Sequence, residues 1–173
     1  MISLVMDTSN SYLAVGLYQD NVCLEAFQEK GSRRQSEKAI PTLKEVLDRH
    51  RIALKDVNEM IITSGPGSYT GVRVAMTIAK TFAAVSDVRI KSVSSLAAYA
   101  GMNQALSVID ARGHKVFVGV YENGLPLIKE QVVTLEDFAQ LRAEYEDFEL
   151  VGEVGCLGLD EKECDLCANI YAL

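Results

Sequence analysis

The chain begins with Leu4-Val5-Met6-Asp7 and, after a polar turn, Leu13-Ala14-Val15-Gly16-Leu17-Tyr18, and it repeats this pattern 103 residues later as Ser107-Val108-Ile109-Asp110 and Val116-Phe117-Val118-Gly119-Val120-Tyr121. Asp, Gly and Tyr fall in register in both copies. Each copy predicts a strand that ends in Asp, a short turn and a second strand. The repeat favours duplication over a chance match, so it predicts an α/β fold with a first lobe at 1–102 and a second lobe at 103–173.

The rest of the first copy predicts the element order β-β-β-α-β-α-β-α. The third strand is expected at 22–28, helices at 36–50, 70–85 and 95–100, and further strands at 59–64 and 89–93; the segment 30–35 is expected to be a polar loop. A constant offset pairs Leu173 with Thr70. We therefore expect a shortened second lobe with one helix near 135–145, an acidic tail and no counterpart of the helix at 70–85.

Composition and charge limit the function classes. The 173 residues are 49% hydrophobic and 24% charged, which is typical of a globular protein, and no apolar run is long enough for a membrane span. Met1–Asp7 lacks the basic start of a signal peptide, so a cytoplasmic location with reduced cysteines is expected. Twelve acidic residues oppose two basic ones between Glu130 and Asp165. That stretch should repel nucleic acid, so any role with nucleic acid would use the N-terminal half or a partner protein.

Asp7 and Asp110 each end a first strand. If the lobes face each other, both carboxylates would point into the cleft between them, where they could hold a metal ion or act as a base. The alternative is that each aspartate accepts hydrogen bonds from its own turn.

The run Gly65-Pro66-Gly67-Ser68-Tyr69-Thr70-Gly71 lies between a strand and a helix, where backbone amides could bind an anion. It matches neither the P-loop nor the dinucleotide-binding spacing, and a tight structural turn is the favoured interpretation.

Cysteine and histidine chemistry is weakly indicated. Cys164 and Cys167 have a short metal or redox spacing, with Cys156 upstream, but no second pair exists, so an incidental role is favoured over a zinc site or a regulatory disulfide. His50 falls on the apolar stripe of a predicted helix and His114 in a polar turn. The sequence predicts no metal site and no catalytic residues.

The helix predicted at 70–85 is apolar around nearly its whole circumference. Gly71, Ala75, Ala79 and Ala83 form a smooth ridge along it, which would let another helix approach closely. We expect this ridge to face a partner protein rather than the core of its own chain.

Several of these motifs together resemble the bacterial TsaB (YeaZ) family, the non-catalytic paralogues of the TsaD (Gcp, glycoprotease-like) proteins. The motifs are Met6-Asp7-Thr8-Ser9, Gln35-Ser36-Glu37, Ser64-Gly65-Pro66-Gly67-Ser68-Tyr69-Thr70-Gly71-Val72-Arg73, Ser92-Val93-Ser94-Ser95-Leu96 and Ile109-Asp110-Ala111-Arg112. The resemblance implies the ASKHA fold, the duplicated ribonuclease-H-like lobes shared by actin, sugar kinases and Hsp70. The chain departs from the family at Gln35, where many relatives have histidine, and in its shorter C-terminal lobe.

The resemblance also implies a function. Family members are scaffold subunits that form heterodimers with TsaD, which makes N6-threonylcarbamoyladenosine in ANN-decoding tRNAs, and a small ATPase, TsaE, joins that complex. The shortened lobe bears on the TsaE contacts more than on the TsaD contacts. Alone, the protein is a candidate homodimer. The alternatives are a small ATP-dependent kinase or ATPase of the same fold, and a peptidase, which the absence of a zinc pair or activated nucleophile disfavours.

The implied interface lies on the helices near 36–50 and 70–85. We expect contacts with TsaD from Ile40, Leu43 and Leu47 on the first helix, and from Gly71, Val72, Ala75, Met76, Ala79 and Ala83 on the second. Weak ATP or ADP binding is expected at Asp7, Thr8, Ser9 and Asp110, with no other cofactor.

Overall fold

The computed structural model describes residues 1–31 and 35–173, so part of the loop predicted at 30–35 lies outside the described residues. The elements are β1 (Ile2–Asp7), β2 (Tyr12–Gln19), β3 (Val22–Lys30), α1 (Gln35–Arg49), η1 (Leu54–Asp56), β4 (Glu59–Thr63), α2 (Tyr69–Val85), β5 (Arg89–Val93), α3 (Ser95–Ala100), β6 (Ala105–Arg112), β7 (Lys115–Glu122), β8 (Leu125–Pro126), β9 (Gln131–Thr134), α4 (Leu135–Glu144), β10 (Glu149–Gly152), η2 (Val154–Leu157) and α5 (Leu166–Ala172). The predicted order of the first eight strands and α-helices is confirmed.

The first sheet has the strand order β3-β2-β1-β4-β5. β1, β2 and β3 are antiparallel, whereas β4 and β5 run parallel to β1. Both faces of β1 are buried: Leu4 and Met6 face the helices α1 and α2, and Val5 faces the opposite side. A strand buried on both faces reads as a continuous apolar run, which is why Leu4-Val5-Met6 shows no alternation.

The second sheet repeats this topology in the order β10-β6-β7-β8, with β9 also paired to β7. β6, β7, β8 and β10 take the places of β1, β2, β3 and β4, so the predicted duplication is confirmed. The constant offset is wrong beyond β8, because α4 has 10 residues where α1 has 15, and β10 follows correspondingly early. A short helix, α5, follows β10, but it packs with α3 between the sheets, so it is not a counterpart of α2, which covers the outer face of its own sheet.

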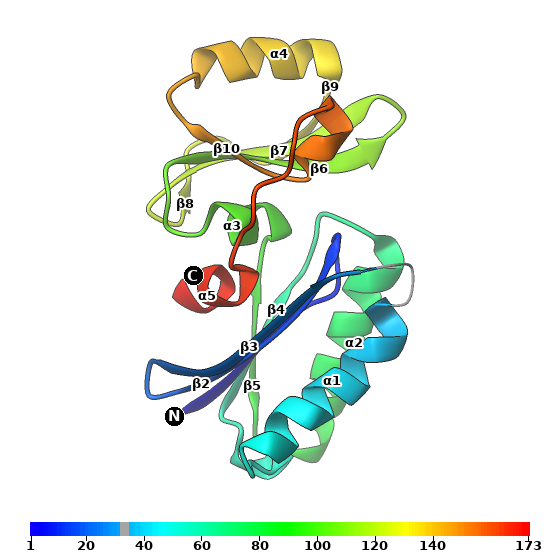
Figure 1. Cartoon of the computed structure of the whole chain (residues 1–173), viewed down its shortest axis with the longest axis vertical. Coiled ribbons are helices and arrows are strands. Elements are labelled where there is room, and N and C mark those ends of the chain that lie inside the picture. The colour runs from blue at the N-terminus through cyan, green and yellow to red at the C-terminus, as the bar shows by residue number, and fades with distance from the viewer. Residues whose placement is uncertain (32–34) are drawn as a thin grey trace.

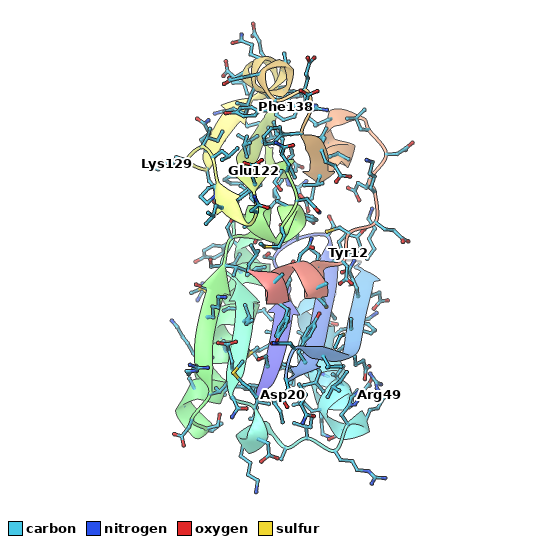
Figure 2. The ribbon with its side chains drawn as sticks, turned by 90° about the vertical axis from the view of Figure 1, so that its left-hand side faces the viewer. Tyr12, Asp20, Arg49, Glu122, Lys129 and Phe138 are labelled. Atoms are coloured by element: carbon cyan, nitrogen blue, oxygen red, sulfur yellow. The ribbon has the colours of Figure 1, made fainter. Side chains whose placement is uncertain are left out.

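The molecule is built of five layers, visible in Figure 1 as helices and sheets stacked along its length. α1 and α2 cover the outer face of the first sheet, α3 and α5 lie between the two sheets, and α4 covers the outer face of the second. Phe138 of α4 points down into that last core (Figure 2).

The C-terminal segment returns to the first lobe. α5 lies across the strands of the first sheet (Figure 2), where the Tyr171 ring stacks on Tyr18 with centroids 3.9 Å apart. The Gln28 side chain holds the approach to α5, donating to the Cys164 carbonyl and accepting from the Leu166 amide. The division at residues 102 and 103 stays a prediction, because α3 from before it and α5 from after it share one layer.

None of the helices that the structure describes is long and apolar enough to cross a membrane.

Candidate functional site

An open groove of about 400 Å³ lies between α1 and α2 on the outer face of the first lobe. Its walls are largely apolar, and Arg73 is the one charged side chain among the described residues that line it. The lining residues are Ser36, Ile40, Tyr69, Thr70, Arg73, Val74, Thr77 and Ile78. A groove between two helices with apolar walls can accept a helix of another protein.

α2 has an inner and an outer face. The helix begins at Tyr69 after Ser68, whose hydroxyl accepts a hydrogen bond from the Gly71 amide at 3.3 Å. Gly71, Ala75 and Ala79 are buried against the protein's own sheet, whereas Met76 is 37% exposed and Ala83 lies in solvent. The outer face therefore carries apolar side chains that nothing in the described chain covers.

The predicted orientation of the ridge is wrong for Gly71, Ala75 and Ala79. Small residues there allow α2 to approach its own sheet: a Cβ on Gly71 would lie 1.9 Å from the Thr8 carbonyl oxygen. These three residues are buried inside the chain because its own sheet supplies the close-packed neighbour that we expected from a partner.

The predicted contacts on α1 likewise include both buried and exposed residues. Leu43 and Leu47 are 3% and 6% exposed and belong to the core, so they are not available to a partner, whereas Ile40 is 62% exposed at the groove. Of the predicted set, Ile40, Met76 and Ala83 are exposed and Val72 is half-buried. Their role in partner binding stays a prediction.

Two residues of the groove were missed from the sequence. The Arg73 guanidinium donates from Nη1 to the Tyr69 hydroxyl at 3.0 Å and lies 5.3 Å from the centroid of the Tyr69 ring. Tyr69 lies in the glycine-rich run and Arg73 follows it by two residues, so they stand four apart at the start of α2, a spacing that brings side chains together on a helix. That spacing was the signal that could have revealed them.

The glycine-rich run is a structural turn, as favoured. Its Ser68 amide donates to the Ser9 carbonyl at 2.7 Å, and the Thr8 hydroxyl donates to the Gly71 carbonyl at 2.6 Å. A Cβ on Gly67 would lie 2.3 Å from the Ser9 carbonyl oxygen. The turn thus fastens α2 to the loop after β1, and the Ser68 amide is already used inside the protein.

Asp7 does not face the cleft between the lobes, so that expectation is wrong. It is fully buried, and its Oδ1 accepts hydrogen bonds from the Ser9 amide at 2.8 Å, the Ser9 hydroxyl at 2.6 Å and the Thr63 hydroxyl. The alternative, an aspartate that orders its own turn, describes it better, and its Oδ2 is buried with no hydrogen-bond partner among residues 1–31 and 35–173. Thr8 and Ser9 are buried with it.

Asp110 does line the cleft, which measures about 600 Å³. Its Oδ1 accepts from the Arg112 amide at 2.8 Å, and its other oxygen lies 3.4 Å from the Arg112 guanidinium, so it too stabilises its own turn. The structure therefore does not bring Asp7 and Asp110 together as a pair of free carboxylates.

Glu153 bridges the two lobes at this cleft, and no sequence pattern indicated it. Its Oε1 accepts from the Ser11 hydroxyl at 2.8 Å and its Oε2 from the Asp110 amide at 3.1 Å. This contact joins the turn after β1 to the turn after β6.

The cysteines and histidines serve packing or lie in solvent. Burial, with a further contribution from Asp165, raises the pKa of Cys164 to about 11 and that of Cys167 to about 12. His50 is half-buried with Nε2 2.9 Å from Glu25 Oε2, and His114 is exposed. Residues 1–31 and 35–173 contain no group of three or more potential metal ligands.

Comparison of the sequence with known proteins finds relatives with a named biosynthetic role. The family model described as "TsaD: tRNA N6-adenosine threonylcarbamoyltransferase" matches residues 28–151. The chain is 32% identical to the tRNA threonylcarbamoyladenosine biosynthesis protein TsaB of Bacillus subtilis over 83% of its own length and 67% of the relative's. It is 30% identical to TsaB of Escherichia coli over 70% of its own length and 57% of the relative's.

The fold comparison points the same way. YeaZ from Pseudomonas aeruginosa superposes with a TM-score of 0.79 at 22% identity, covering 99% of this chain and 89% of that structure. The match spans 57% to 67% of the length of three curated TsaB relatives, those of Bacillus subtilis, Escherichia coli and Buchnera aphidicola, the last at 60%. On sequence and fold together, the chain belongs to the TsaB (YeaZ) family.

Proposed function

We propose that the chain is a scaffold subunit that supports N6-threonylcarbamoyladenosine modification of ANN-decoding tRNAs in the cytoplasm by forming a heterodimer with a TsaD-like catalytic protein. Membership of the family supports the pathway, since the TsaB relatives are named as biosynthesis proteins for this nucleoside. The observation that carries the proposal is the uncovered apolar groove between α1 and α2.

The exposed residues around the groove suit a protein interface. Tyr69 is 75% exposed and Ile40 is 62% exposed, so covering them would remove substantial apolar surface from water. Tyrosine and arginine are also the residue types that most often dominate binding energy in protein interfaces. This composition favours a lasting partner over a passing encounter.

The residues at the other candidate site favour a non-catalytic role. Asp7, a candidate metal ligand or base from the sequence, is fully buried in the first lobe and accepts three hydrogen bonds through Oδ1. Asp110 and Glu153 at the cleft are engaged with neighbouring turns. Weak nucleotide binding, self-association and contact with a TsaE-like ATPase remain predictions.

A strain in which this gene replaces the resident TsaB gene tests the proposal. The nucleosides of its tRNA are measured by mass spectrometry, with the empty vector as control. We expect N6-threonylcarbamoyladenosine to be restored only when a TsaD-like protein from the same source is present. Modification of tRNA by the purified chain alone, without any TsaD-like protein, would overturn the non-catalytic assignment.

A further inference from the structure

The groove between α1 and α2 contains the guanidinium of Arg73, which has no counter-ion in the part of the chain that the structure describes. Among the described residues, no carboxylate oxygen lies within 4 Å of the Arg73 guanidinium, whereas Arg49, Arg89 and Arg112 each have one within that distance. The side chain is nonetheless held in place, because its Nη1 donates to the Tyr69 hydroxyl at 3.0 Å.

Tyr69 leaves most of the guanidinium available. The Cζ of Arg73 lies 5.3 Å from the centroid of the Tyr69 ring, a cation–π distance. An arginine carries five N–H donors in a planar fork, and the tyrosine uses one of them. A fork that is positioned in advance and open to one side is suited to a carboxylate, which can accept two parallel hydrogen bonds.

A partner that covers the groove must also accommodate the charge of the Arg73 guanidinium. Burying a guanidinium without a counter-ion is strongly unfavourable, so a helix that fills the apolar walls must also supply an acceptor at Arg73. The net charge of −7 is concentrated between Glu130 and Asp165, in the second lobe, whereas the rest of the chain carries 15 basic and 12 acidic residues. An acidic residue on the partner would be favoured at Arg73, the one charged side chain among the described residues that line the groove, and this pairing would fix the register of docking.

We propose that the groove accepts a helix of the TsaD-like partner whose apolar stripe is interrupted by one aspartate or glutamate, and that this carboxylate binds Arg73 on its Tyr69 support. The inference rests on the proposed heterodimer. It names the chemistry of the docking element and makes Arg73 the residue that selects it.

Calorimetric titration with the TsaD homologue of the same organism tests this. Arg73→Glu should weaken binding at least about a hundredfold, because it places two carboxylates against each other. Arg73→Lys, which keeps the charge but loses the fork, should weaken binding about tenfold. The matched control is Lys55→Glu, an equal change of charge at an exposed site on η1 beyond the far end of α1. It should change affinity less than about twofold.

The Arg73→Glu variant should melt like the wild type, because its side chain is exposed. A second arm changes each acidic residue on the partner's surface helices to arginine, one at a time. One of these changes should restore the binding of Arg73→Glu at least about tenfold.

The two proposals fail in different ways. If the wild-type chain does not bind the TsaD homologue at all, the proposed function fails. If the wild type binds and Arg73→Glu binds as well as Lys55→Glu, or if no partner substitution restores binding, the heterodimer stands and the carboxylate on Arg73 is contradicted.

Discussion

Gly71 and Thr8 meet at a backbone contact that joins α2 to the loop after β1. The Thr8 hydroxyl donates to the Gly71 carbonyl, and a Cβ on Gly71 would lie 1.9 Å from the Thr8 carbonyl oxygen. The Thr8 oxygen belongs to the backbone, and an added Cβ on Gly71 would be fixed to the backbone of α2. The clash could therefore be relieved only by moving α2 or the loop after β1. The glycine is therefore fixed by packing rather than by a need for unusual dihedral angles.

Gly71→Ala should lower the free energy of unfolding by about 2 kcal/mol or more, because overpacking a tight contact forces the backbone apart. Urea unfolding followed by circular dichroism measures this. Thr70→Ala, next in the chain with an exposed side chain, is the control and should change stability by less than about 0.5 kcal/mol. Equal stability of the two variants would show that α2 does not approach the β1 loop this closely.

The thiols of Cys164 and Cys167 should resist alkylation in the folded protein. Their raised pKa values, about 11 and about 12, keep them protonated at neutral pH, and burial denies access to the reagent. With iodoacetamide at pH 7.5, mass spectrometry should find Cys23, which is exposed, modified first. Adding urea should expose all four cysteines. Rapid labelling of Cys167 in the native state would contradict the packing of α5.

At the scale of single elements, α2 shows how far sequence reasoning reaches. Its composition correctly indicated a helix with apolar residues on both sides. Periodicity could not decide which side meets the sheet, because Met76 on the exposed side is as apolar as Ala75 and Ala79 on the buried side. Only the position of α2 above β4 and β1 settles that question, and this depends on contacts distant in the sequence.

A buried and an exposed position of the same ridge on α2 should respond differently to a long charged side chain. Ala79→Arg places it in the core, where an unpaired charge costs about 3–5 kcal/mol, and the melting temperature should fall by several degrees or the protein should not fold. Ala83→Arg, at an exposed position one turn nearer the C-terminal end of α2, should melt normally. Differential scanning fluorimetry separates the two. A melting temperature like that of the wild type for Ala79→Arg would contradict the burial of Ala79 and would support the partner interface expected from the sequence.

α1 is fastened to β3 by Glu25. Hydrogen bonds from Arg49 hold the pKa of Glu25 below its ordinary value, partly offset by burial, and His50 adds to the lowering. Because the folded state lowers this pKa, the stability that Glu25 adds is present at neutral pH and is lost as the pH falls below the ordinary glutamate value near 4.3.

Glu25→Gln should therefore destabilise the protein by about 1 kcal/mol or less at pH 7, and the difference from wild type should shrink toward pH 3. Urea midpoints at the two values measure it. Glu144→Gln, an exposed glutamate outside the ion pairs of the described residues, is the control and should show no such pH dependence. A difference that grows on acidification would contradict the lowered pKa.

At the scale of the whole molecule, the repeat in the sequence predicted two lobes that start with the same pair of strands, and the structure shows that their sheets share a strand order. It could do so because buried strands must carry apolar residues wherever the topology recurs. The return of α5 to the first sheet was not predictable in this way. It depends on side-chain matches such as Gln28 with the backbone at Cys164 and Leu166, which leave no periodic signal.

The candidate sites show the same difference between features that a local motif indicates and features that depend on contacts between distant segments. Motifs indicated the turn at Gly65–Gly71 and the two helices, whereas the sealing of Asp7 followed from hydroxyls on three separate elements. Thr63 ends β4, Ser9 follows β1, and Ser95 begins α3; together they enclose the carboxylate. No spacing within one segment could show that these groups converge.

The most direct test of the central claim is the mass of the species formed when the purified chain is mixed with the TsaD homologue of the same organism. Light scattering during size-exclusion chromatography, at micromolar concentrations of both proteins, measures it. We expect a complex containing this 18.9 kDa chain and the TsaD homologue, and its loss with Ala83→Arg. Two separate peaks at the masses of the free proteins, with the wild-type chain, would contradict the account.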